Sequence, residues 1–209
     1  RDLTGVMLLT RFHMAIYAHP SFPANSIGEL VALAKKEPGK VSYAYATTQT
    51  LLGMELFNSM AGTRMGNVPY KGSGQALTDL LGGHIQLLVD PVLQSSVEHA
   101  KLGKLKVIGT LGATPSALTP GASLPRDVVP GYEFSGAFGL VTRAGTPPAL
   151  VRRIRDDFAA VMQLPEVAAR IRDIGQEANP STPEEYYAYI LAETKKWEPV
   201  VKATGVKLN

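Results

Sequence analysis

Apolar residues recur along this chain in two spacings, one typical of strands and one typical of amphipathic helices. The run Leu3–Ala18 is apolar and partly β-branched, which predicts one or two strands. Further on, apolar residues at helical spacing follow helix start signals. These are the capping box Ser26–Glu29, an N-cap at Thr146 before Pro147, and a cap at Thr182–Glu185. The same pattern predicts strands over residues 40–46, 65–70, 84–90, 105–110 and 134–142, and helices beginning near residues 27, 51, 75, 91, 147, 165 and 183.

The order of these elements predicts an α/β protein. Strands and helices alternate with short turns as far as residue 110, which favours a parallel or mostly parallel sheet covered by helices. Residues 113–131 interrupt the alternation with four prolines and form a long irregular excursion. From about Gly145 the chain is almost all helix, and such a segment needs a sheet to cover. That sheet is either the one just described or one that lies upstream of Arg1, and we favour the second.

Composition excludes several classes of protein. The chain has 209 residues, of which 45% are hydrophobic and 19% charged, as in an ordinary globular protein. Cysteine is absent, which excludes disulfides and thiolate metal sites, and the four histidines lack the spacing of metal ligands. The net charge of +3 is small and scattered, so nucleic acid is not expected as a partner. No apolar run is long enough to span a membrane, and Arg1–Thr4 reads as the middle of a protein, so we expect an upstream segment.

A glycine-rich turn is the most informative feature of the chain. It reads Tyr70-Lys71-Gly72-Ser73-Gly74 and separates a predicted strand from a short amphipathic helix. Glycine lets a ligand approach the backbone closely, and a helix N-terminus offers unpaired N–H groups and a positive dipole end, as in an anion site. Lys71 either pairs with a ligand charge or is a solvated lysine, and Ser73 is a candidate cap of the helix. The turn points to capture of a small acid.

Nine short fragments, in this order, carry a family resemblance. They are residues 26–30 (SIGEL), 38–40 (PGK), 54–57 (MELF), 68–72 (VPYKG), 76–83 (ALTDLLGG), 100–105 (AKLGKL), 138–140 (FGL), 144–147 (AGTP) and 181–185 (STPEE). Each fragment alone is weak, but their joint order is specific. Over essentially its whole length the chain resembles the tripartite tricarboxylate transporter receptors, the Bug-type (TctC-like) periplasmic solute-binding proteins.

The resemblance implies a type II-like periplasmic-binding-protein architecture, a two-lobed Venus flytrap with the ligand cleft between its lobes. The chain would hold one complete α/β lobe and the C-terminal helical part of the other, with the signal peptide and the start of the first lobe preceding it. The expected parts are a crossing segment from the first lobe (1–14), the second α/β lobe (15–131), a return crossing strand (132–144) and the C-terminal helices of the first lobe (145–209).

The resemblance also implies that loops of both lobes hold the ligand's carboxylate. In this chain Thr47, Thr48 and Thr50 open a helix, and their hydroxyls and free N–H groups would bind that carboxylate. A simpler interpretation is that a threonine only caps the helix. The family commonly has a Gly/Ser/Asn-rich loop followed by histidine here, whereas this chain has Leu51, so the identity of the ligand stays open.

Two further residues complete the candidate site. Asp90 ends a predicted strand at the carboxyl edge of the sheet, where α/β proteins place ligands. It would accept a hydrogen bond from a ligand ammonium or cap the helix beginning at Pro91. Phe138, on the return crossing strand, would line the cleft or pack in the hinge. The family often has tryptophan just before it, where this chain has Ala137.

The function that the resemblance implies is periplasmic capture of a small organic acid, such as a di- or tricarboxylate, an amino acid or an aromatic acid. The receptor would close about its crossing strands and deliver the ligand to integral membrane permease subunits of a tripartite transporter. The alternative is a ligand-sensing module that signals to a regulator or sensor kinase. No enzyme and no cofactor is expected, because the chain lacks a nucleophile elbow and a strong base. Without an upstream sheet the C-terminal helices would expose apolar faces, so we expect this chain to oligomerise or aggregate.

Overall fold

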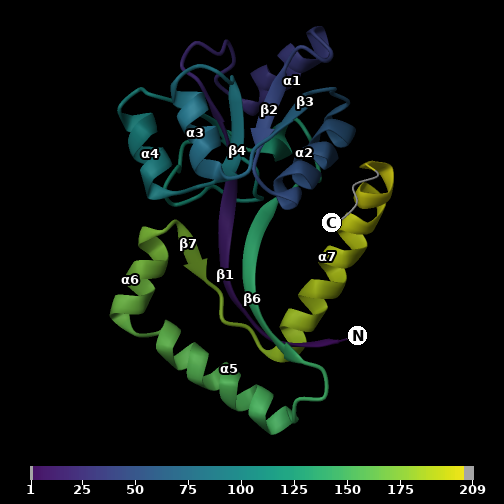
Figure 1. The fold of residues 1–209 in the computed structure, drawn as a ribbon, viewed down its shortest axis with the longest axis vertical. Helices are drawn as coiled ribbons and strands as arrows, with labels where there is room; N and C mark the ends of the chain where they lie inside the picture. Colours follow the sequence, from purple (N-terminus) through teal and green to yellow (C-terminus); the bar gives the residue numbers. More distant parts are fainter. Residues whose placement is uncertain (1, 205–209) are drawn as a thin grey trace. The chain divides into compact units, whose positions relative to one another are not determined.

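The computed structural model describes residues 2–204, which form two compact units (Figure 1). Unit 1 is built on residues 2–12 and 136–203, and unit 2 on residues 13–135. The apolar run at the start of the chain forms a single strand, β1 (Leu3–Ala18), which belongs to both units. The chain returns from unit 2 to unit 1 through β6 (Ser135–Arg143).

The sheet of unit 2 has the strand order β3-β2-β4-β1-β5. Strand β2 pairs in parallel with β3 and β4, whereas β1 pairs antiparallel with β4 and β5. All strands of this sheet except β1 therefore run in one direction, which confirms the predicted mostly parallel sheet. The bounds are β2 (Ser42–Tyr45), β3 (Gly66–Pro69), β4 (Leu87–Pro91) and β5 (Lys106–Thr110).

The helices of unit 2 begin and end close to the predicted signals. They are α1 (Ile27–Lys36), α2 (Thr48–Ala61), α3 (Ser73–Leu81) and α4 (Gln94–Lys101), with a short 3-10 helix at Pro125–Asp127 inside the irregular excursion. Ser26 caps α1, since its hydroxyl accepts a hydrogen bond from the Glu29 amide. The Glu29 carboxylate accepts from the Asn25 amide rather than from Ser26, so the capping box is shifted by one residue.

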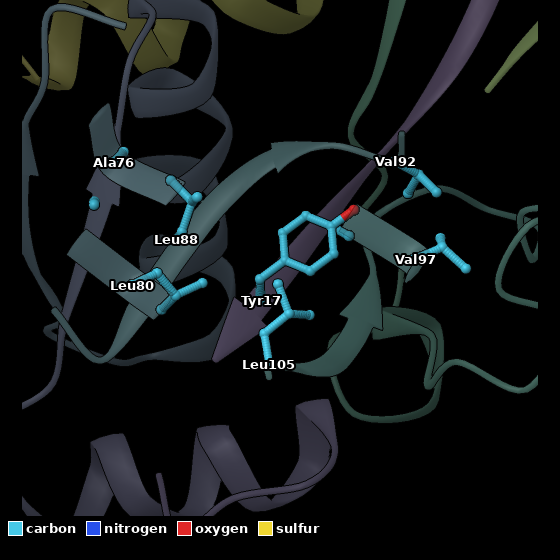
Figure 2. Packing of buried hydrophobic residues seen from close by; sticks show 9 residues of the cluster. Tyr17, Ala76, Leu80, Leu88, Val92, Val97 and Leu105 are labelled. Carbon is cyan, nitrogen blue, oxygen red and sulfur yellow. The ribbon is translucent and has the colours of Figure 1, made fainter. Parts of the chain in front are cut away.

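One core of unit 2 lies between its sheet and the helices α3 and α4. Figure 2 shows the ring of Tyr17, from β1, among aliphatic side chains of β4, α3, α4 and the segment before β5. Tyr17 is fully buried, and its hydroxyl donates a hydrogen bond to the Pro91 carbonyl (3.2 Å) at the end of β4. This core holds the carboxyl end of β4 firmly against β1.

Unit 1 combines its part of β1 with β6, β7 and three helices. β6 and β7 both pair with β1, and β7 (Gln176–Ala178) lies antiparallel to Thr10–Phe12. The helices are α5 (Pro148–Met162), α6 (Pro165–Asp173) and α7 (Pro183–Thr204). Thr182 and Glu185 form the expected capping box of α7, which continues through Pro199. The cap predicted for Thr146 was wrong, because Pro147 is the N-cap of α5.

Unit 1 has a small core and many exposed apolar side chains. Its core joins Val6 and Met7 of β1 to Val151, Ala159 and Met162 of α5. The exposed large apolar residues of this unit are Leu3, Phe138, Val141, Leu150, Phe158, Val161, Leu164, Ile174, Tyr187 and Leu191. Exposed apolar side chains of this kind are a precondition for the oligomerisation or aggregation predicted above. The oligomeric state itself stays a prediction. Within residues 2–204 no helix combines the length and apolarity needed to cross a membrane.

Candidate functional site

Three neighbouring strands of unit 2 end at one edge of the sheet. Because β2, β3 and β4 are parallel, their carboxyl ends lie together, and each is followed by a helix that begins there (Figure 1). Tyr45 is in register with Pro69, and the Tyr70 amide donates a hydrogen bond to the Tyr45 carbonyl (2.9 Å). The threonine loop, the glycine-rich turn and Asp90 therefore share this edge.

The threonine loop forms the N-terminus of α2. Thr47 is the N-cap; its Oγ1 accepts from the Thr50 amide (3.2 Å) and lies 2.7 Å from Thr50 Oγ1. Capping by a threonine is therefore confirmed, and the Thr50 side chain is buried. Helix geometry leaves the amides of Thr48 and Gln49, in the first turn, without intrahelical partners. Ligand binding by Thr47, Thr48 and Thr50 stays a prediction. The groups in this loop best placed to bind a ligand are the backbone amides of the first helical turn rather than the hydroxyls.

The glycine-rich turn opens α3 without a side-chain cap. Gly72 is the N-cap, so the expectation that Ser73 caps this helix was wrong. A Cβ at Gly72 or Gly74 would meet nothing within 4 Å, and the φ of −175° at Gly72 is ordinary extended backbone. Neither conformation nor packing within residues 2–204 requires glycine here. The open space beside both glycines leaves the bare amides at the start of α3 accessible to a small molecule.

The two residues that lead into this turn have different surroundings. The Tyr70 hydroxyl donates to Asp79 Oδ2 (2.8 Å), a hydrogen bond that raises the pKa of Tyr70 and ties the turn to α3. Lys71 is exposed and forms no ion pair within the described residues. Tyr70 thus positions the turn, while the Lys71 ammonium is available to an anion.

Asp90 is a buried carboxyl group at the end of β4. Its exposure is 6%, and its Oδ1 accepts a short hydrogen bond from the Ser73 hydroxyl (2.6 Å). Burial raises the pKa of Asp90 to about 6, although the hydrogen bond from Ser73 lowers it. The alternative that Asp90 caps the next helix was wrong, because the N-cap of α4 is Leu93 and no side chain caps that helix.

Phe138 belongs to unit 1, whereas the groups described above belong to unit 2. Its side chain is 53% exposed, and its ring centroid lies 5.1 Å from that of Phe12 in the same unit. A contact with Phe12 fits the packing interpretation, and lining of a ligand cleft stays a prediction.

Thr110 is a further polar residue at this edge, and it is absent from the candidate residues predicted above. It ends β5 and is in register with Ala15, which is in register with Asp90 on its other side, so the three side chains share one face of the sheet. Thr110 is fully buried, and its hydroxyl has no hydrogen-bond partner within residues 2–204. The rule that selected Asp90, a polar residue ending a predicted strand, would also have selected Thr110. Nowhere in the described part of the chain do three or more potential metal ligands cluster.

Similar proteins of known structure share this fold. A protein of R. palustris solved with adipate has a TM-score of 0.83 and 28% identity, over 98% of this chain and 69% of that one. A structure described as a periplasmic transporter has a TM-score of 0.84 and 30% identity, over 100% and 70% of the two chains. Periplasmic binding protein BugD has a TM-score of 0.81 and 25% identity, over 98% and 70%. The fold is therefore that of periplasmic binding proteins of the TctC/Bug type.

Sequence comparison gives the family. The family model described as "Tripartite tricarboxylate transporter family receptor" matches residues 1–206, and the chain belongs to this family of solute-binding receptors. Protein BugT of Bordetella pertussis is 27% identical over 211 residues, which cover 100% of this chain and 64% of BugT. A protein encoded in the gbd 5' region of Cupriavidus necator is 27% identical over 209 residues, which cover 99% of this chain and 63% of that protein. The chain thus spans a little under two thirds of the length of these relatives.

Proposed function

We propose that this chain is part of a periplasmic receptor that captures a small organic acid and delivers it to the membrane permease of a tripartite transporter. The observation that carries the proposal is the shared sheet edge of unit 2, where α2 and α3 begin with bare amides beside an open glycine turn. Such amides, at the positive ends of two helix dipoles, suit a carboxylate. The adipate bound to the R. palustris relative supports an acid as ligand.

The mechanism we propose is binding followed by closure, with no chemical step. The ligand's carboxylate would accept hydrogen bonds from the backbone amides of the two loops, with support from threonine hydroxyls, Lys71 and ordered water. Closure about the segments that join the two units, β1 and β6, would then bury the ligand.

A thermal-shift screen tests the proposal. The purified chain and its natural full-length protein would be melted with about one hundred small carboxylates, amino acids and sugars. A ligand at 100 times its dissociation constant stabilises the folded state by about 2.7 kcal/mol, which corresponds to a rise in Tm of several degrees for a chain of this size. We expect such a rise from one class of acids. Sugars that stabilise the full-length protein while every acid leaves its Tm unchanged would contradict the proposal.

Substitution of Gly74 separates binding from folding. Gly74 is a helical residue whose added Cβ would meet no atom within 4 Å, so Gly74→Ala is expected to stabilise the protein by up to about 1 kcal/mol. The same methyl group would stand where the ligand approaches the amides of α3. We therefore expect roughly tenfold weaker binding of the acid found in the screen, about 1.4 kcal/mol.

The control is Gly66→Ala. Gly66 begins β3, at the opposite end of that strand from the glycine turn, and its added Cβ would meet only Ser42 Cβ, at an ordinary contact distance of 3.7 Å. Calorimetric titration of both variants gives the comparison. Equal affinities in Gly74→Ala and Gly66→Ala would remove the glycine turn from the site.

A further inference from the structure

Asp90 is a buried acid that no basic side chain of residues 2–204 neutralises. Within residues 2–204 its carboxylate receives one side-chain hydrogen bond, from Ser73, and forms no ion pair. The other titratable group beside it is Tyr17 from β1, whose pKa is raised mainly by burial and slightly by the charge of Asp90. Burial of an unpaired carboxylate is unfavourable, and proteins generally pair such a group. A cationic group from outside residues 2–204 would relieve that cost.

The position of Asp90 determines which groups a bound ligand would contact. The Ser73 hydroxyl lies 2.6 Å from Asp90 Oδ1, and the amide of the same Ser73 is the first of α3. A ligand carboxylate bound to the amides of α3 would thus lie within a few ångströms of the Asp90 carboxylate. Two carboxylates at that distance repel each other unless a positive charge lies between them.

We propose that Asp90 binds the ammonium group of the ligand, so that the site takes an α-amino acid rather than a plain dicarboxylate. An α-amino acid has its ammonium one carbon away from its carboxylate, which places the two charges on neighbouring partners: the carboxylate on the α3 amides and the ammonium on Asp90. Ser73 holds Asp90 Oδ1 in position through its hydroxyl. This inference rests on the proposed function and specifies its ligand.

The test compares acids that differ only in the amino group. Calorimetric titrations of the natural full-length protein at pH 7.5 would use three pairs: glutamate and glutarate, aspartate and succinate, 2-aminoadipate and adipate. We expect at least one amino acid to bind tenfold or more tightly than its partner. In Asp90→Asn that amino acid should bind 10- to 100-fold more weakly, since a charge-assisted hydrogen bond is lost. The plain dicarboxylates should bind equally well or more tightly, because a negative charge has been removed.

Asp127→Asn is the matched control. It removes the same charge from an exposed side chain of unit 2 and should leave every affinity unchanged. A melting curve of Asp90→Asn at pH 7.5 checks that the variant is folded.

Two outcomes would overturn the inference and are distinguishable from failure of the proposed function. If dicarboxylates bind as tightly as their amino counterparts, the proposed function as an acid receptor is retained, but the proposed binding of an ammonium group by Asp90 is wrong. If the amino acid is preferred and Asp90→Asn keeps that preference, another group recognises the ammonium. If no acid of any kind binds, the proposed function fails together with the inference.

Discussion

Replacing Asp90 with asparagine is expected to raise the free energy of unfolding by about 2 kcal/mol at pH 7.5 and to leave little of that gain at pH 4. The pKa of Asp90 rises from 3.8 to about 6 on folding. The folded state therefore holds a proton that the unfolded state releases, and stability falls as the pH rises from about 4 to about 6. Above this pH window, a pKa difference of about two units lowers the stability of the wild type by about 3 kcal/mol. Asparagine removes this penalty, but burial of its amide costs about 1 kcal/mol, which leaves a net gain of about 2 kcal/mol.

Urea unfolding of the wild type and Asp90→Asn at pH 4 and pH 7.5 measures the effect. The difference between the two proteins should grow with pH, whereas Asp127→Asn, whose carboxylate is exposed, should show no such trend. A variant less stable than the wild type at pH 7.5 would mean that the Asp90 carboxylate is stabilised by its surroundings. Stabilisation would indicate that an acid is kept at this position at a cost to folding, as at many binding sites.

Replacing Asn58 with alanine is expected to destabilise unit 2 by about 3–4 kcal/mol, the largest loss that we predict. Asn58 is a buried residue of α2 whose side chain makes three hydrogen bonds. Its Nδ2 donates to the Met65 carbonyl (3.1 Å), and its Oδ1 accepts from Thr63 Oγ1 (2.9 Å) and from the Met65 amide (3.2 Å). Alanine would leave these groups buried without partners, at about 1–3 kcal/mol for each group left unpaired.

The measurement is the urea midpoint of Asn58→Ala against that of Asn67→Ala. Asn67 is an exposed asparagine of β3 whose side chain makes no hydrogen bond within the described residues, so its loss should cost less than about 0.5 kcal/mol. The hydrogen bonds of Asn58 connect α2 to the segment just before β3. Helix α2 begins at the candidate site and β3 ends there, so Asn58 helps to position both elements. A loss below about 1 kcal/mol in Asn58→Ala would show that the segment holds without this network.

Local signals in the sequence predicted the features that depend on neighbouring residues. The Thr47 cap of α2 and the Thr182–Glu185 box of α7 were readable because each joins residues three positions apart. The alternation of strands and helices predicted the mostly parallel sheet, and the position of Asp90 at the end of a predicted strand placed it at the carboxyl edge.

Features that depend on distant residues were not predictable in this way. The caps predicted for Ser73 and Asp90 were wrong because the helices begin at other residues than expected. Helix α3 begins earlier than predicted, and α4 begins later. A shift of a few residues at a helix end changes which residue is the cap. The bond between Ser73 and Asp90 joins residues 17 positions apart, on different elements, and the three-residue β7 is too short to have a period. Pairing of β1 with strands of both units also has no local signal.

The most direct test of the central claim is to map the ligand on the backbone amides by NMR. The natural full-length protein, labelled with ¹⁵N, would be titrated with the acid that stabilises it most in the screen. If the amides that open α2 and α3 bind the carboxylate, the largest shifts in unit 2 will fall on Thr48, Gln49, Ser73 and Gly74. Shifts in unit 2 that leave these four amides unmoved would contradict a carboxylate site at this edge of the sheet.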